Sequence, residues 1–395
     1  MYNTYTENID TEKYIKVKYY LESAKKLDYA AWCLAIGQSV GNPSVRNKWE
    51  TDELFQKHSC IIEGDKQKLS KLNKGYVHIG FPKINIDFSS DGISHLLVNI
   101  MGGQLDIEGI DKCSIIDIEL PKDVESVFKG PKFGIEGIRK YTEVYNKPIL
   151  GAIIKPKTGV SPEVLLDMVK ELVDGGVNFI KEDEILSSPT FCRLEDRIPI
   201  IAKYLENKKV IYCSSIHADP PYLIDRVKMV HELGGNGVHV NFWCGLGAYK
   251  AIRELDLPIF LHFQKSGDKI ITNYNHDFYI SWNVICKLIS LMGVDFAHCG
   301  MIGGYYKWKN QETIDSVKTL RQRNTLPVLS CGLHPGLIDF ITEFVGMDYM
   351  ANVGGCIHGH PDGTKSGAKA MRQSIDKEYK KEYHDAIQKW GYHEH

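Results

Sequence analysis

The sequence predicts an α/β protein in which a (β/α)8 (TIM) barrel follows a smaller α+β domain. From about residue 148, short β-rich runs alternate with amphipathic segments that have apolar residues at helical spacing. A (β/α)8 barrel consists of eight such strands, seven crossovers between them and a helix after the last strand, and the sequence matches this count. The 395 residues leave room for a second module beside a barrel of roughly 250. The predicted domains are residues 1–130 and residues 131–395.

The elements of the first domain are predicted from local patterns. Tyrosine, valine and isoleucine favour strands, whereas helical spacing that ends at glycine favours helices. Strands are expected over 13–23 and 75–86, and helices over 27–38 and 92–103. The strand order of this domain is not predicted.

The eight barrel strands are expected where apolar runs end in polar residues. They are predicted over 148–156, 178–184, 209–217, 237–244, 258–264, 295–301, 327–333 and 349–356. Helices such as 161–176, 221–235 and 280–293 separate them, and several end at glycine. A doubly wound open sheet is the alternative fold, but no GxGxxG motif follows the first strand.

Composition and charge narrow the function classes. A net charge of −2 and a pI near 6.7 give no sign of a nucleic-acid or membrane-surface partner. The polar N-terminus has no apolar signal core, and no apolar run reaches membrane-helix length. Ten cysteines without a CxxC pair are typical of reduced thiols. We therefore expect a soluble cytoplasmic protein.

Barrel active sites lie at the C-terminal ends of the strands. Polar side chains or glycines gather at these predicted ends: Lys155, Lys157, Lys181, Asp183, Glu184, His217, Asn241, His262, His298, Ser330, Gly354 and Gly355. So many reactive groups at corresponding positions predict one functional site.

The second strand ends in the sequence NFIKEDE. Asp183 and Glu184 supply hard oxygen ligands suited to Mg²⁺. The ammonium of Lys181 would be repelled by a metal, but reaction with CO₂ would convert it into a carbamate with anionic oxygens. Structural salt bridges are the alternative interpretation of these residue types.

Two other strand ends suggest a base and a phosphate site. Lys155 and Lys157 flank a proline, and a lysine whose pKa is lowered by burial and a nearby cation can act as a general base. A surface lysine pair is the alternative. Gly332, Gly354 and Gly355 follow strands seven and eight, where backbone N–H groups often bind phosphate. His358 and His360 are interpreted as structural.

These motifs resemble those of the RuBisCO large-subunit family from about residue 13 onward. The sequence FIKEDE resembles its Mg²⁺ motif, with Lys181 as the carbamate, and IIKPKTG resembles the motif that contains its proton-abstracting lysine, here Lys155. NIMGG resembles its substrate-contacting segment, with Asn99 as the asparagine. His262, His298, Ser330, Gly332, Gly354 and Gly355 match later site positions. The resemblance implies a ferredoxin-like N-terminal domain and a homodimer with shared active sites.

Several carboxylase residues are replaced. Tyr305 stands where carboxylases have a mobile lysine, with Lys307 two residues further on, and Phe263 replaces the arginine that binds a second phosphate. The N-terminal catalytic glutamate is replaced by Gly37. The neighbouring threonine and tryptophan are replaced by Asn42 and Pro43. This combination resembles the RuBisCO-like (form IV) branch, as do the segments 130–140 and 358–363.

The resemblance implies Mg²⁺-dependent enolisation of a phosphorylated ketose, such as the 2,3-diketo-5-methylthiopentyl 1-phosphate enolase step of methionine salvage. That enolase uses a lysine as base where this chain has Gly103. An isomerase of 5-methylthioribulose 1-phosphate and a decarboxylase or transcarboxylase of a phosphorylated keto sugar acid are alternatives. A true carboxylase and a catalytically silent binding protein are further alternatives.

Overall fold

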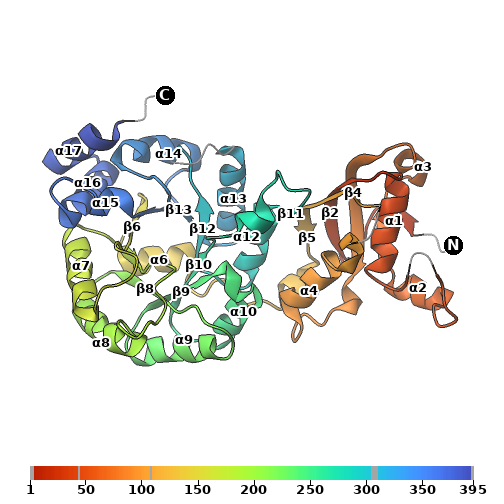
Figure 1. Cartoon of the computed structure of the whole chain (residues 1–395), viewed down its shortest axis with the longest axis horizontal. Coiled ribbons are helices and arrows are strands. Elements are labelled where there is room, and N and C mark those ends of the chain that lie inside the picture. The colour runs from red at the N-terminus through yellow and green to blue at the C-terminus, as the bar shows by residue number, and fades with distance from the viewer. Residues whose placement is uncertain (1–3, 43–44, 107–108, 304–309, 393–395) are drawn as a thin grey trace. The chain divides into compact units, whose positions relative to one another are not determined.

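The computed structural model describes residues 4–42, 45–106, 109–303 and 310–392. The chain divides into two compact units (Figure 1). The first comprises residues 1–128 and 268–288, and the second comprises residues 129–267 and 289–395. None of the helices in these described ranges is both long and apolar enough to cross a membrane.

The first unit is built on a mixed six-stranded sheet with the order β1-β3-β4-β2-β5-β11. Its strands are β1 (Tyr5–Thr6), β2 (Tyr14–Glu22), β3 (Ile61–Glu63), β4 (Lys74–Pro82), β5 (Lys112–Glu119) and β11 (Phe278–Ile280). Buried and partly exposed residues alternate along β2, as expected for a sheet with one covered face. Its helices are α1 (Leu27–Gly37), α2 (Asp52–His58), α3 (Lys66–Leu69), α4 (Gly92–Ile100), α5 (Lys122–Glu125) and α11 (Lys269–Thr272). Tyr19 of β2 donates a 2.8 Å hydrogen bond to the Ile100 carbonyl of α4.

The segment 268–288 differs from the sequence prediction, which placed it wholly in the barrel. It leaves the barrel after β10 and adds β11 as a parallel edge strand beside β5, with Phe278 opposite Cys113. The pairing is reinforced by a 2.9 Å hydrogen bond from the Cys113 N–H to the Asp277 carbonyl.

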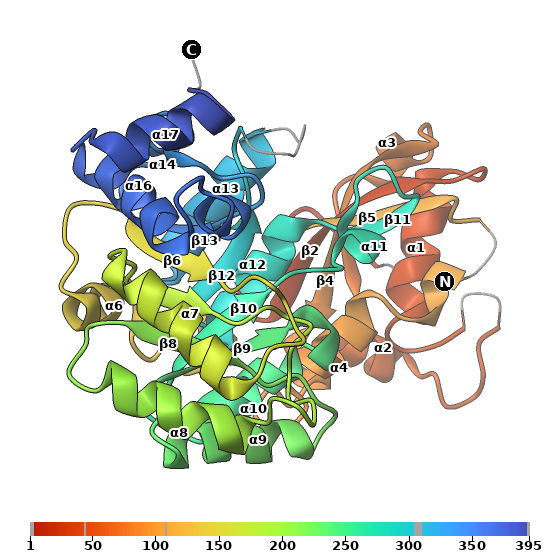
Figure 2. The same cartoon turned by 60° about the vertical axis from the view of Figure 1, so that its left-hand side comes forward.

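The second unit is a closed barrel of eight parallel strands, with the order β6-β7-β8-β9-β10-β12-β13-β14 and β14 paired with β6 (Figure 2). The strands are β6 (Ile149–Ile153), β7 (Phe179–Lys181), β8 (Ile211–Ser215), β9 (Gly237–Asn241), β10 (Phe260–Gln264), β12 (Phe296–Gly300), β13 (Leu326–Leu329) and β14 (Met350–Val353). The helices that follow them in turn along the chain are α7 (Pro162–Asp174), α8 (Leu194–Leu205), α9 (Tyr222–Glu232), α10 (Gly247–Glu254), α12 (Trp282–Leu291), α13 (Asn310–Gln322), α14 (Ile338–Val345) and α16 (Thr364–Asp376). The residues of α12 up to 288 belong to the first unit. Short α15 (Gly355–His358) precedes α16, and α17 (Lys381–Trp390) follows it.

Apolar side chains fill the N-terminal half of the barrel. Phe179, Ile211, Phe260 and Phe296 belong to one buried cluster. Helix α6 (Gly134–Thr142) precedes the first barrel strand, and Ile138 of this helix is part of the same cluster. Phe133 stacks on Phe260 with 4.1 Å between ring centroids. This end of the barrel is therefore packed, and the polar side chains lie toward the other end.

The predicted fold class is confirmed. All eight predicted barrel strands are present, and the closing pair β14–β6 shows that the alternative of a doubly wound open sheet is wrong. In the first unit, β2, α1, β4 and α4 lie where strands and helices were expected.

Candidate active site

Side-chain alternation at the end of β7 separates the charged residues of NFIKEDE. Phe179 points into the barrel, where its ring lies 5.0 Å from that of Phe296. Alternation then directs Lys181 and Asp183 inward and Glu182 outward. Lys181 is 1% exposed and Asp183 is 1% exposed, so both charges are buried.

Glu182 is a structural residue. It forms a buried ion pair with Arg197 of α8, whose Nε and Nη2 lie 2.6 and 2.7 Å from its two carboxylate oxygens. The Tyr212 hydroxyl and the Ser215 N–H also donate to this carboxylate, at 2.6 and 2.7 Å. The salt-bridge interpretation of the motif therefore applies to Glu182, and this pair fastens α8 to the strand that carries the site.

Four charged side chains meet where β6 and β7 end. The Lys181 Nζ lies 3.2 Å from Oε2 of Glu184 and donates to the Glu182 carbonyl at 2.8 Å. The Lys155 Nζ forms an ion pair with Oδ2 of Asp183. Two lysine–carboxylate pairs thus lie next to each other at the C-terminal end of the barrel.

Burial sets the protonation of this group. Desolvation lowers the pKa of Lys181, although the nearby carboxylates oppose it. Burial alone would raise the pKa of Glu184, but the Lys181 ammonium, a backbone N–H and the Ser266 hydroxyl hold it well below its usual range. Glu184 is therefore an anion, and the Lys181 amine loses its proton more readily than an exposed lysine would.

Glycines follow β13 and β14, and Gly354, directly after β14, lies beside Lys155. A Cβ on Gly354 would lie 3.3 Å from Cε of Lys155, whereas a Cβ on Gly355 would meet open space. Gly332 has a φ of +86° and follows Cys331, which has a φ of +79°. Such left-handed backbone is unusual outside glycine and is concentrated at functional sites.

Two histidines in the middle of β10 and β12 are held neutral. Desolvation lowers the pKa of His298 to about 3 and lowers that of His262 well below its usual value. The His298 Nε2 forms a hydrogen bond with the Ser330 hydroxyl. His358 contacts the Ile153 carbonyl through Nε2 at 3.1 Å, and His360 contacts the Glu382 carbonyl through Nε2 at 3.0 Å. Both of the latter contacts are with backbone, as expected for structural histidines.

Two further predicted site residues have other surroundings. Lys157 is exposed in the loop after β6. Asn99 belongs to the first unit, where its amide donates to the His95 carbonyl at 2.9 Å. Its role stays a prediction.

The carboxylase replacements have different surroundings. Phe263 is fully buried on the outer side of β10, and its ring centroid lies 5.1 Å from that of Tyr249. A Cβ on Gly37 would lie 2.0 Å from the Gln104 side chain, so a larger residue there would displace that side chain. Tyr305, Lys307 and Pro43 lie outside the described residues.

The structure adds residues that strand-end patterns did not single out. The Ser266 hydroxyl lies 2.9 Å from Oε1 of Glu184, and the Ser266 carbonyl accepts from the Asn241 amide at 3.2 Å. His239 is fully buried in the middle of β9. Its position two residues before Asn241 on the same face was the available signal. Lys265, after β10, contributes a positive charge near His298.

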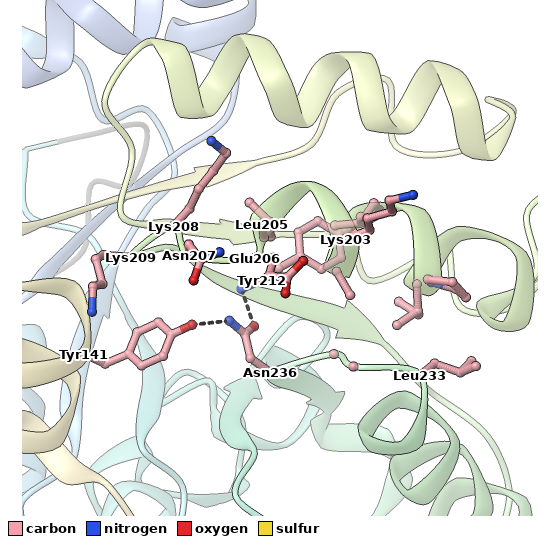
Figure 3. A pocket seen from close by; sticks show the side chains of 16 residues that line it. Tyr141, Lys203, Leu205, Glu206, Asn207, Lys208, Lys209, Tyr212, Leu233 and Asn236 are labelled. Atoms are coloured by element: carbon pink, nitrogen blue, oxygen red, sulfur yellow. Dashed lines mark hydrogen bonds between the residues drawn. The ribbon is translucent and has the colours of Figure 1, made fainter.

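A separate pocket of about 570 Å³ lies at the opposite end of the barrel strands (Figure 3). It is lined by residues that precede β8 and β9, including Lys208 and Asn236. The Asn236 amide donates to the Tyr141 hydroxyl at 2.8 Å and accepts from the Tyr212 N–H at 2.9 Å. None of the predicted site residues lines this pocket. In (β/α)8 enzymes the chemistry is at the other face.

The closed barrel carries charged side chains directly after β6 and β7, where (β/α)8 enzymes have their active sites. The chain belongs to the family of the ribulose bisphosphate carboxylase large chain, whose catalytic domain matches residues 134–390. It is 32% identical to a ribulose bisphosphate carboxylase of Archaeoglobus fulgidus, over 92% of this chain and 91% of that protein. It is also 30% identical to a 2,3-diketo-5-methylthiopentyl-1-phosphate enolase of Geobacillus kaustophilus, over 92% of each chain. The fold matches the octameric carboxylase from Pyrococcus horikoshii with a TM-score of 0.89 at 25% identity, over 98% of this chain and 96% of that one.

Proposed function

We propose that this protein catalyses Mg²⁺-dependent enolisation of a phosphorylated ketose, in which a proton is removed from the carbon beside a ketone. The observation that carries the proposal is the meeting of Lys155, Lys181, Asp183 and Glu184 at the ends of β6 and β7. The enolase named above among the similar proteins supports the same reaction class. Phe263 argues against a bisphosphate substrate, because it stands where carboxylases have the arginine that binds the second phosphate.

The donor set fits Mg²⁺ if Lys181 becomes a carbamate. Among the described residues, no three His, Cys, Asp or Glu side chains converge as metal ligands. Asp183 and Glu184 provide two carboxylates, and Glu182 is held by Arg197. A carbamate on Lys181 would be the third oxygen donor, and burial favours the unprotonated amine that reacts with CO₂. Bound there, Mg²⁺ would place positive charge beside the substrate carbonyl and stabilise the charge that develops on it.

The remaining roles follow from position. Lys155 would remove the proton, because it is the lysine at the barrel mouth beside Gly354. The backbone N–H groups of Gly332, Gly354 and Gly355 would bind one phosphate. The neutral imidazoles of His262 and His298, with Ser330, would hydrogen-bond substrate oxygens.

The test is solvent deuterium incorporation. The protein is incubated in D₂O with Mg²⁺, bicarbonate and phosphorylated ketoses, starting with 2,3-diketo-5-methylthiopentyl 1-phosphate, and the substrate is analysed by mass spectrometry. We expect exchange beside the carbonyl that EDTA abolishes and that Lys181→Ala lacks. Absence of exchange with every ketose would contradict the proposal. Fixation of labelled CO₂ onto ribulose bisphosphate would support a carboxylase instead.

Ser266→Ala should weaken Mg²⁺ binding by about tenfold, because residues that orient a metal ligand typically contribute 10–100-fold in affinity. Ser266 holds Glu184 through a 2.9 Å hydrogen bond. Calorimetric titration of Mg²⁺ in the presence of bicarbonate measures the effect. Asp167→Ala on the exposed surface of α7 is the control. Equal Mg²⁺ affinities of the two variants would show that Ser266 does not support the metal site.

A homodimer with shared active sites is proposed as the functional assembly. One similar solved structure is a dimeric archaeal RuBisCO from Hyperthermus butylicus, whereas the Pyrococcus horikoshii enzyme is octameric. Light scattering should give twice the 44.8 kDa of one chain. A mass equal to one chain would contradict the proposal.

A further inference from the structure

The interior of the barrel beside Lys181 is polar. Lys181, His239, His298 and Asn352 come from β7, β9, β12 and β14, which are alternate strands of the barrel. In (β/α)8 barrels, four inward side chains from alternate strands form one layer of the core. Such layers are ordinarily filled by branched apolar residues, so a polar set needs an explanation.

Several polar atoms in and beside this set have no hydrogen-bond partner among the described residues. His239 is 0% exposed, and neither ring nitrogen has a hydrogen-bond partner among the described residues. The His217 ring packs edge-on against it with 5.0 Å between centroids, and its Nε2 is also without a partner. The His217 Nδ1 accepts from the Asn241 N–H at 3.1 Å, which fixes that ring. Buried polar groups are normally paired, so these atoms point to a missing partner.

The positive charge of Lys181 acts on both His217 and His239. After desolvation, its ammonium is the next cause that lowers the pKa of His217 and of His239. Both imidazoles are therefore neutral, with one N–H donor and one lone pair each. A neutral imidazole can present its lone pair to an ammonium or, as the other tautomer, its N–H to an anion. It can thus adapt to a change of charge on Lys181 without exchanging a proton with solvent.

A carbamate on Lys181 would need such a donor. The described neighbours of Lys181 in the strand register are Ile153, which is apolar, and Cys213, whose thiol is a weak donor. Its contacts with Glu184 and the Glu182 carbonyl are with acceptors only. A carbamate oxygen turned away from the metal would therefore lack a donor on these sides.

We propose that His239, supported by the ring of His217, is a positioning residue that donates its imidazole N–H to the carbamate formed on Lys181. In that step the unprotonated Nζ forms a bond to the carbon of CO₂, one C–O π pair moves onto oxygen, and the nitrogen releases a proton to water. The inference rests on the proposed function, because it requires the carbamate. Its consequence is that His239 sets how much CO₂ the protein needs for activation.

The test is a titration of carbamate with ¹³C-labelled bicarbonate, followed by ¹³C NMR without substrate. The signal assigned to Lys181 is the one that Lys181→Ala lacks. His239→Leu should require about tenfold more CO₂ for half-carbamylation, because charge-assisted hydrogen bonds are roughly twice as strong as neutral ones. His239→Gln keeps a donor and should stay near the wild-type value. Ser214→Ala, which removes an equally buried and unpartnered hydroxyl on the adjacent strand, is the matched control.

A second measurement tests the inference even if His239→Leu does not fold. In wild-type protein with ¹⁵N-labelled histidine, bicarbonate should shift the His239 resonance and leave that of His231 on α9 unchanged, with His239→Gln giving the assignment. Carbamylation with the same CO₂ requirement in His239→Leu, or an unshifted His239 resonance, would overturn the inference and leave the proposed function standing. Absence of a wild-type signal dependent on Lys181 would overturn the carbamate itself, and with it this inference.

Discussion

Replacing Lys155 with methionine should slow deuterium incorporation by about 10²- to 10⁴-fold, the range that a positioned general base contributes. Methionine is unbranched like lysine but has no amine to accept the substrate proton. The lysine forms an ion pair with Asp183 and lies beside Gly354, so its amine is at the candidate site. The exchange assay in D₂O measures the loss, and Mg²⁺ titration shows whether the metal site survives.

Two further variants make the Lys155 prediction specific. Lys170→Met removes an exposed lysine of α7 that pairs with Asp167, and it should exchange like wild type. Lys157→Met tests the other lysine of the motif. Loss of exchange in Lys157→Met with retention in Lys155→Met would assign the base to Lys157.

Replacing Glu182 with leucine should lower the free energy of unfolding of the barrel by about 3–5 kcal/mol, because it leaves the Arg197 guanidinium buried without its counter-ion. Both residues are 0% exposed, and the carboxylate accepts hydrogen bonds from Arg197, Tyr212 and Ser215. The double replacement Glu182→Leu with Arg197→Leu should be less destabilising than Glu182→Leu alone. Denaturant unfolding of all three proteins measures this.

A surface ion pair provides the comparison for Glu182. Asp167→Ala breaks the exposed pair with Lys170 and should change stability by less than about 1 kcal/mol. A loss in Glu182→Leu no larger than in Asp167→Ala would show that the buried pair does not hold α8 to β7. Because Glu182 lies between Lys181 and Asp183, its replacement is also expected to weaken Mg²⁺ binding.

The barrel could be predicted from the sequence because its signals are local. Each β-rich run is short, each intervening helix has apolar residues at regular spacing, and eight repetitions leave few alternatives. The candidate site was predicted by the same kind of reasoning. The C-terminal ends of parallel strands share one face, so Lys155, Asp183 and Ser330 were assigned to it from their positions in the sequence.

Other features depended on contacts between residues distant in sequence. Composition alone treats the three acids of NFIKEDE alike, and only packing against α8 shows that Glu182 pairs with Arg197 while Asp183 faces Lys155. Strand β11 is three residues long, too short for a periodic pattern, and it exists because β5 supplies its hydrogen-bond partners. His239 lies mid-strand in an apolar run.

The sequence by itself therefore determined the fold, the succession of the barrel strands and the end of the barrel that carries the candidate site. Periodicity and strand ends are properties of residues that are neighbours in the sequence. The tertiary structure decided which charges are paired, where the segment 268–288 belongs and which imidazoles surround Lys181, since burial and hydrogen bonding depend on partners that folding brings together from separate strands.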